Sequence, residues 1–415
     1  MKYWRGYLVA VILGAITWGL TRLAAEYSTL VDMVYPYLTR TVQNFLAGWS
    51  GGVDFCVWQV AVVLLILLVV ATIVLMIVLR WNFFQWLGWV LTGVVTIYFA
   101  HTCVYGLNYH AGPLADDIRL EVTDYTLDEL QDATIYYRDL ANKLADQVSR
   151  DGSGDVIFPS FHELAEQAGD GFETLTYEKS YSVFAGSTLP VKELGWAEMY
   201  ASMGITGVSM GLTGEAAVNP QTPAVGLPFT MSHEMAHRMC IAIERDANFA
   251  AFLACSNNSS VEFQYSAYFM AYRYCYYALA SQGSAEAATA AARIATGVNE
   301  NLKHDWNTYG QFFADQQDEG ATRFADIAND TYLKTSGDED GIASYDEVSS
   351  LLVCWHIQEV VLPAQQQEAE STFDPYDENQ VDLNGIVGAL KGNWYGANVS
   401  DPCGRTSVTG ADAFG

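Results

Sequence analysis

Two histidines and a glutamate stand at metal-binding spacing in the stretch SHEMAHRM, residues 232–239. In a helix, positions i and i+4 lie on one face, one turn apart, so His233 and His237 can direct their imidazoles to one metal ion. Glu234 lies beside them, where its carboxylate can take a proton from a metal-bound water. This HExxH pattern is typical of zinc hydrolases, in which two neutral nitrogen ligands neighbour a general base.

A catalytic zinc site needs a third protein ligand and one open position. On a straight helix, Glu244 would lie about 10.5 Å further along the axis than His237, which is too far for its carboxylate to share their metal. We therefore expect the chain to turn near residues 239–241 and to return Glu244 on a second helical piece.

Composition and charge limit the class of protein. The chain has 415 residues, of which 51% are hydrophobic and 13% aromatic, so it can bury a sizeable core. Residues 1–105 hold three acids and five bases, which leaves 45 acids and 15 bases to residues 106–415. A surface so acidic repels phosphate backbones and excludes nucleic acid as a partner.

Three apolar segments near the N-terminus predict membrane spans at about residues 7–25, 57–80 and 83–106. Between the first two, residues 31–49 have helical apolar spacing, which suits either a helix at the membrane interface or a structured loop. The bases Lys2, Arg5 and Arg80 favour the cytoplasmic side. We therefore expect a multi-pass protein of the cell membrane, with everything after the third span outside the cell.

Longer runs around the motif resemble a known family. The runs GITGVSMGLTGEAAVNPQT and LPFTMSHEMAHRMCIAIERDANFAAFLAC, together with GLNYHAGPL, QYSAYF and SYDEVSSLL, are similar to the bacterial membrane proteins called domain of unknown function 3810. That family is grouped with HExxH metallopeptidases of the gluzincin type, in which a downstream glutamate completes the zinc site. The resemblance extends from the spans to about residue 360.

The resemblance implies a mainly α fold, in which the N-terminal transmembrane helices precede a zincin-like, mostly helical soluble domain with a small β-sheet. We expect a membrane region over residues 1–107 and a zincin-like metallohydrolase domain over residues 108–362. Residues 363–415 are rich in Gln, Asp, Asn and Gly, which predicts a loosely structured C-terminal tail.

The resemblance also identifies candidate ligands. In zincins with an ExxAD or ExxAN signature the leading glutamate is the ligand, and ERDAN, residues 244–248, matches it. This points to Glu244, with Asp246 as the alternative, and implies that Asn248 orients a histidine. Where relatives tend to carry glycine, this chain has Cys240. A positive φ there would cost cysteine about 1 kcal/mol or more, and Cys240 as a fourth, inhibitory ligand is a further alternative.

Together these features predict a membrane-anchored zinc metallopeptidase. Zinc would polarise the scissile carbonyl and lower the pKa of its water to about 7, while Glu234 acts as general base and passes the proton to the leaving amine. The extended segment 204–212 offers an edge strand for a peptide substrate. Tyr265 and Tyr268 either stabilise the oxyanion or pack in the core, and Glu215 either lines the cleft or caps a helix.

Other interpretations stay open. A non-catalytic membrane sensor or scaffold could retain the zincin fold, but a structural zinc site has no need of the intact Glu234. Residues 336–347, SGDEDGIASYDE, come close to a calcium loop, but Ser336 stands at its first position and we interpret the segment as an ordinary connection. We interpret His101 in the third span as an interfacial or bundle-facing residue. The implied partners are a peptide or protein substrate and the lipid bilayer, and nothing in the sequence specifies an oligomeric state.

Overall fold

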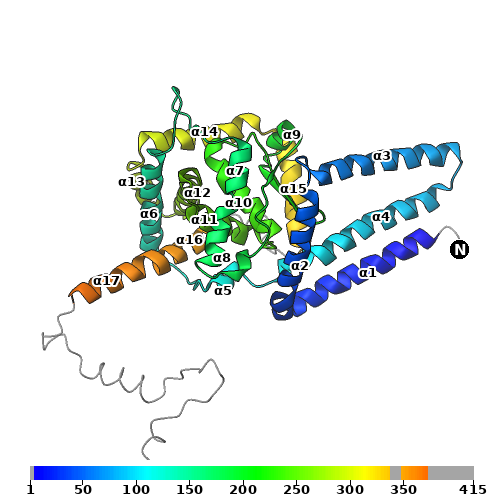
Figure 1. Ribbon diagram of the computed structural model, residues 1–415, viewed down its shortest axis with the longest axis horizontal. Coiled ribbons are helices and arrows are strands. Elements are labelled where there is room, and N and C mark those ends of the chain that lie inside the picture. Colours follow the sequence, from blue (N-terminus) through cyan, green and yellow to red (C-terminus); the bar gives the residue numbers. More distant parts are fainter. Residues whose placement is uncertain (1–3, 337–346, 373–415) are drawn as a thin grey trace, which may run out of the picture. The chain divides into compact units, whose positions relative to one another are not determined.

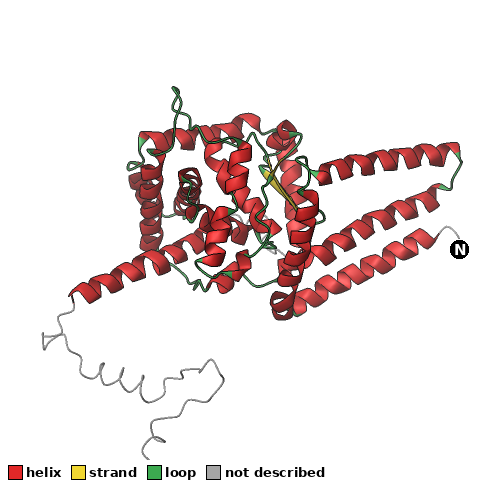
Figure 2. Cartoon of the chain, viewed as in Figure 1, coloured by secondary structure: helices red, strands yellow, loops and turns green. Residues whose placement is uncertain are grey.

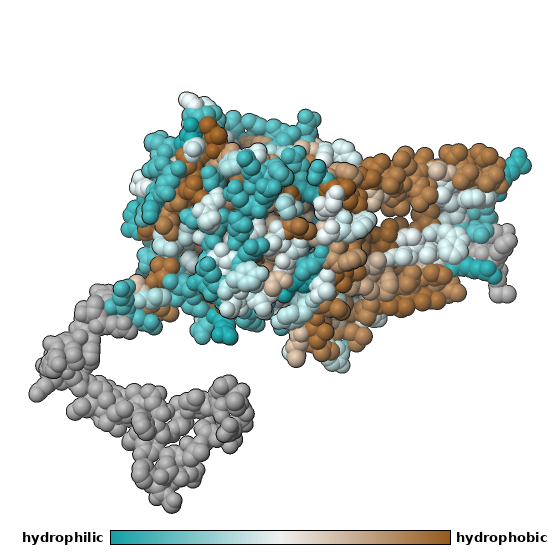
Figure 3. Space-filling model, viewed as in Figure 1, coloured by the Kyte–Doolittle hydropathy of each residue, from teal (hydrophilic) through white to brown (hydrophobic). Residues whose placement is uncertain are grey.

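Three helices near the N-terminus are long and apolar enough to cross a membrane: α1 (Arg5–Glu26), α3 (Val57–Val78) and α4 (Phe83–Val104). The computed structural model describes residues 4–336 and 347–372. Helix α1 packs closely on α4, where the hydroxyl of Thr92 donates to the carbonyl oxygen of Gly6 at 2.7 Å. Figure 3 shows a hydrophobic surface over the spans and a mostly hydrophilic one over the rest of the visible face. The prediction of three apolar spans is confirmed.

Helix α2 (Ser28–Ser50) lies between the first two spans and follows α1 after the single residue Tyr27. One face of α2 is buried and carries Arg40, Gln43 and Ala47. Of the two alternatives for this segment, helix and loop, the structure has the helix.

The domain that follows α4 is mainly helical (Figure 2). Two capping boxes fix helix starts, one formed by Thr126 with Glu129 and one by Ser160 with Glu163. Its helices are α5 (Leu114–Ile118), α6 (Leu127–Ala145), α7 (Phe161–Gln167), α8 (Asp170–Tyr177), α9 (Ala197–Ser202), α10 (Leu227–Arg238), α11 (Glu244–Ser256), α12 (Val261–Ala280), α13 (Ala285–Ala295), α14 (Glu300–Gln316), α15 (Glu319–Ser336) and α16 (Val348–His356), with 3-10 turns η2 (Gly106–His110), η3 (Ser182–Phe184) and η4 (Ala224–Gly226).

A small mixed sheet flanks the histidine helix. Its strands β1 (Lys192–Glu193), β2 (Gly207–Met210) and β3 (Glu215–Val218) lie in the order β1-β3-β2, with β1 parallel and β2 antiparallel to β3. The central strand β3 is buried, and β2 forms an edge. Gly214 has φ +65°, a conformation that glycine adopts without strain, in the tight β2–β3 turn. The predicted small sheet and its edge strand are confirmed.

The hydrophobic core surrounds α10, which contacts β2 and β3 as well as α11 and α12. Met231 and Met235 of α10 are fully buried, and Phe252 of α11 packs edge-on against Tyr137 of α6. Because α10 is held between the sheet and these helices, the position of its histidines is fixed by packing rather than by a loop.

The chain divides into two units, residues 1–357 and 358–415. In the second, the structure describes the end of the π-helix Ile357–Val361 and helix α17 (Leu362–Thr372). The first ten residues of the predicted loose tail are therefore helical, in keeping with the helix-forming Ala, Gln and Glu of this stretch. Residues 373–415 of that tail, and residues 337–346 of the calcium-like segment, lie outside the described residues.

Candidate metal centre

A break between two helices brings the two parts of the motif together. Helix α10 ends at Arg238 and α11 begins at Glu244, so the predicted turn is confirmed. In the turn, the amide of Cys240 donates to the carbonyl oxygen of His237 at 2.8 Å. Cys240 has φ +72°, the left-handed conformation that glycine adopts more easily than any other residue.

The break places three candidate ligand atoms in a small triangle. The Nε2 atoms of His233 and His237 lie 3.1 Å apart, and Oε2 of Glu244 lies 3.2 Å from the first and 3.4 Å from the second. Ligand atoms bound to a tetrahedral zinc ion at about 2.0–2.2 Å are separated by about 3.2–3.6 Å. The triangle therefore fits such an ion closely. Within the described parts of the chain, it is the one group of three or more His, Cys, Asp and Glu side chains at metal-binding separation.

The hydrogen bonding of His237 prepares it to bind a metal. Its Nδ1 lies 2.8 Å from the carbonyl oxygen of Ile241. A carbonyl oxygen only accepts, so Nδ1 is the donor and Nε2 of the neutral ring has a bare lone pair. That lone pair lies 3.4 Å from Oε2 of Glu244, and the repulsion between these two electron-rich atoms is relieved by a cation or a proton.

The charges at the triangle are consistent with a cation site. Burial lowers the pKa of His237, but the carboxylate of Glu244 more than offsets this and raises the pKa to about 9. Burial alone would raise the pKa of Glu244. The nearby His237 and His233 lower this pKa by more than burial raises it, so the net pKa is well below its usual range. In the metal-free protein, a proton is thus retained where a metal cation would be bound.

Glu234 lies beside the triangle and directly over a glycine of the edge strand. A Cβ atom on Gly207 would come within 2.6 Å of Cγ and 2.7 Å of Cδ of Glu234, so any larger residue would displace the carboxylate. Burial raises the pKa of Glu234 to about 6, although His233 and His237 oppose the shift. A carboxylate that takes up a proton near neutral pH has the property required of a general base.

The alternative ligand and the predicted supporting residue have other partners. Oδ2 of Asp246 accepts from the amide of Leu114, the first residue of α5, at 2.9 Å, and Oδ1 accepts from Arg245. Asp246 is therefore not part of the triangle and anchors α5 to α11. Asn248 accepts a hydrogen bond from Tyr274 at 3.3 Å rather than orienting a histidine.

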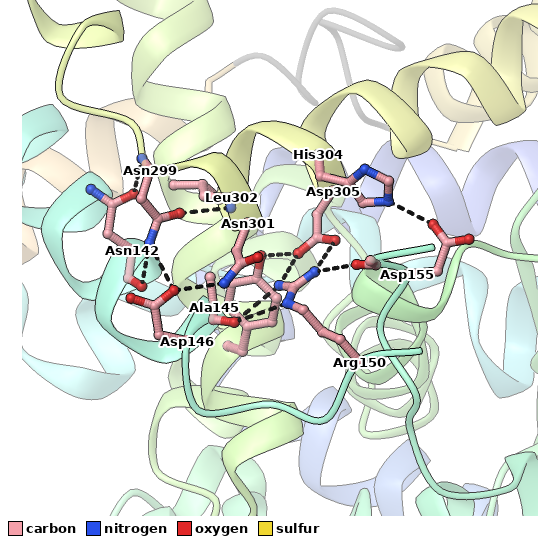
Figure 4. A network of polar contacts seen from close by, with 12 residues as sticks. Asn142, Ala145, Asp146, Arg150, Asp155, Asn299, Asn301, Leu302, His304 and Asp305 are labelled. Atoms are coloured by element: carbon pink, nitrogen blue, oxygen red, sulfur yellow. Dashed lines mark hydrogen bonds and ion pairs between the residues drawn. The ribbon is translucent and has the colours of Figure 1, made fainter. Parts of the chain in front are cut away.

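The two tyrosines considered for the oxyanion lie in the core. The hydroxyl of Tyr265 is hydrogen-bonded to Asp305, which pairs with Arg150 at 2.7 Å (Figure 4). Tyr268 packs against Phe252 and Tyr137, so of the two alternatives for these tyrosines the structure supports packing. Their place on the helix after the motif does not by itself identify a functional residue, because tyrosines are frequent there.

Glu215 caps a helix rather than lining the cleft. Its carboxylate accepts from the amides of Val57 and Trp58 at 2.7 and 2.9 Å, at the start of the span α3, and pairs with Lys192 at 2.7 Å. A carboxylate at a helix N-terminus satisfies amides that have no partner inside the helix. This residue therefore joins the sheet to the membrane region.

A group of buried aromatic residues beside the metal centre was not found from the sequence. Tyr105 and Tyr109 follow α4 and cluster with Ala242 in the turn, and Tyr332 of α15 packs edge-on against Tyr109. Burial raises the pKa of Tyr109 well above its ordinary value, as do the neighbouring tyrosines and the charge of Glu244. His101 near the end of α4 lies 3.3 Å from the hydroxyl of Tyr332 in α15, which agrees with its interpretation as an interfacial or bundle-facing residue.

The cysteines of the described residues are all free. Cys240 is buried, and its thiol is hydrogen-bonded to Thr39 and Asn108. It is therefore directed toward α2 and η2 and is not among the triangle atoms, which disfavours the interpretation of Cys240 as a fourth ligand.

Comparison with known proteins gives one match. Searches of curated proteins and of solved structures each returned no significant match. A family model described as protein of unknown function (DUF3810) matches residues 31–353, from the first turn of α2 to α16. Because this match covers most of the chain, including the candidate metal centre, the chain belongs to the DUF3810 family.

Proposed function

We propose that this protein is a membrane-anchored zinc metallopeptidase that hydrolyses peptide bonds. The observation that carries the proposal is the triangle of His233, His237 and Glu244, whose ligand atoms are 3.1–3.4 Å apart. Two imidazoles and one carboxylate with a fourth position open is the ligand set of catalytic rather than structural zinc sites. The side chain of His233 is 13% exposed, against 9% for His237 and for Glu244, so it is the most solvent-accessible of the three.

The ligand set favours zinc over other common metal ions. Calcium and magnesium prefer oxygen ligands in sixfold or higher coordination, whereas nitrogen ligands from two histidines suit zinc. When bound, zinc would supply Lewis-acid polarisation of the scissile carbonyl and a water that ionises near neutral pH.

Glu234 is proposed as the general base. It takes a proton from the attacking water and passes it to the leaving amine, a role for which its raised pKa suits it. Its place over Gly207 means that a substrate aligned along β2 passes close to this carboxylate.

The edge strand β2 is proposed to bind the peptide. It pairs with β3 on one side and is an edge of the sheet on the other. An extended peptide added to such an edge gains backbone hydrogen bonds that do not depend on its sequence. The phenols of Tyr109 and Tyr332, which cluster beside the turn, are better placed than Tyr265 and Tyr268 to donate to the oxyanion.

The domain is proposed to lie outside the cell, with Arg80 at the cytoplasmic turn between α3 and α4. Protease treatment of intact cells tests this orientation. Cleavage of the domain in intact cells is the expected result, and protection until the cells are lysed would reverse the orientation.

The full-length chain in detergent tests the activity. We expect about one zinc ion per chain by metal analysis, and cleavage of a peptide library that falls about 10²- to 10⁴-fold on Glu234→Gln. Glu166→Gln, an exposed exchange of the same kind on α7, serves as the control. Bound zinc with equal cleavage by wild type and Glu234→Gln would instead favour the non-catalytic sensor or scaffold.

A further inference from the structure

Helix α2 has two opposite faces. Its buried face carries Thr39, Arg40, Gln43, Ala47 and Ser50. On the other side, large apolar residues recur at steps of three, four and seven and are between 54% and 73% exposed. We call them the α2 apolar stripe, and they are Leu30, Met33, Val34, Leu38, Phe45 and Trp49. A stripe this regular marks a helix that meets an apolar partner on that side.

The buried face of α2 holds both sides of the metal centre. The Nε atom of Arg40 donates to the carbonyl oxygen of Met239, in the turn between α10 and α11, at 3.2 Å. Gln43 donates to the carbonyl oxygen of Gly211, in the β2–β3 turn, at 2.8 Å. One helix thus holds the turn that brings Glu244 to the histidines and the hairpin that carries the edge strand.

The surroundings of α2 identify what covers its stripe. One residue separates the end of α1 from α2, and six residues separate α2 from the start of α3. The C-terminal end of α1 and the N-terminal end of α3 therefore lie on the same side of the membrane. The C-terminal end of α4 is on this side as well, because Tyr35 of α2 donates to the carbonyl oxygen of Thr102 at 2.8 Å. In Figure 1, α2 extends from the end of α1 toward the start of α3. Three span ends therefore hold α2 at the membrane surface.

We propose that the α2 apolar stripe is embedded in the interfacial layer of the lipid bilayer, and that α2 thereby holds the turn at residues 239–243 and the β2–β3 hairpin in position. The stripe continues the lipid-facing surface of α1 and α3, whose apolar side chains are similarly exposed. An amphipathic helix with one apolar face lies in the plane of the interface and buries that face among the acyl chains. Arg40 and Gln43 are then positioning residues, and the membrane surface is part of what shapes the site.

Thiol labelling in lipid nanodiscs tests the contact with lipid. The background carries Cys103→Ser and Cys403→Ser, and the other cysteines of the described residues are buried. We expect Phe45→Cys to react with a water-soluble maleimide about tenfold more slowly than Tyr177→Cys, because an apolar environment disfavours the thiolate. Tyr177 is 80% exposed and lies in α8 of the domain, away from the stripe. Equal rates at the two positions would refute the contact with lipid.

Hydrogen exchange in the same nanodiscs tests the effect on the turn, with no dependence on peptidase activity. The double variant Leu38→Glu with Phe45→Glu keeps good helix formers but opposes burial in lipid. We expect the amides of residues 239–241 to exchange about fivefold faster, while those of α12 are unchanged. The matched variant Leu38→Met with Phe45→Leu should behave as wild type. If exchange at the turn is the same in all three proteins, α2 does not transmit its contact with lipid to the site.

Discussion

Gly207 of the edge strand lies directly beneath the carboxylate of Glu234, so close that a methyl group there would occupy the space of the acid. Gly207→Ala should therefore displace the proposed general base and leave the three proposed ligands in place. We expect the turnover rate to fall about hundredfold, at the lower end of what a positioned base contributes, with zinc content unchanged. Gly310→Ala on α14, where nothing lies within 4 Å, is the control. Loss of zinc in Gly207→Ala would show that the exchange disturbs more than the base.

The roles of the two acids of α11 can be separated by metal retention. Glu244→Ala removes a corner of the triangle, and we expect zinc affinity to fall by at least about a hundredfold, since loss of a mere supporting residue already costs up to that much. Asp246→Asn removes an acid that anchors α5, so zinc affinity should change little while thermal stability falls. Chelator competition and thermal unfolding measure the two effects. The opposite pattern would make Asp246 the ligand.

Zinc affinity should depend on pH through His237. Its pKa in the metal-free protein, about 9, is above the ordinary 6.5, so the proton stabilises the metal-free fold fully below pH 6.5 and this contribution is lost as pH rises through 9. Zinc has to displace that proton. Chelator competition should therefore show zinc affinity rising by about tenfold per pH unit between pH 6.5 and 9. An affinity that is flat over this range would contradict a protonated His237.

At position 240, glycine should give a more stable protein than alanine, which is the reverse of the order expected in the middle of a helix. At φ +72° a Cβ atom is strained, so Cys240→Gly should be more stable to thermal unfolding than Cys240→Ala by about 1 kcal/mol. Both variants lose the same thiol, so their comparison isolates the backbone. At the exposed helical position Ala288, glycine should instead be less stable than the native alanine by about 1 kcal/mol. The same order at both positions would mean that the turn relaxes around a side chain.

The buried pair of Glu215 and Lys192 should be important for stability. Glu215→Gln leaves the Lys192 ammonium without its carboxylate at a largely buried site, which costs about 3–5 kcal/mol. Adding Lys192→Met removes the unpaired charge and should recover part of the loss. Unfolding of wild type and of the two variants in detergent measures this, and a double variant no more stable than Glu215→Gln would argue against the pair.

Much of the site could be predicted because it depends on short-range geometry. The spacing of His233 and His237 defines one helix face, and the distance to Glu244 requires the break that is found. The span limits followed from lengths of apolar sequence. These features depend only on residues that are close together in the chain, so they can be predicted from the sequence alone.

Contacts between distant segments were beyond such reasoning. Glu215 is 158 residues from Val57, and Arg40 is 199 residues from Met239. No local sequence pattern predicts either hydrogen bond. Tyr265 has the right residue type at a plausible place, but tertiary packing turns its hydroxyl to Asp305. The closeness of Gly207 to Glu234 likewise depends on how the sheet packs against α10.

The cap that Glu215 places on α3 also limits how this architecture can be rearranged. A water-soluble fragment that starts after α4 would lack α2 and the start of α3. The carboxylate of Glu215 would then lose the hydrogen bonds from the amides of Val57 and Trp58. A chimera with foreign membrane helices would meet the same defect unless it brought a matching helix start. The membrane helices and the domain that follows them are therefore expected to be inherited together, as one indivisible module.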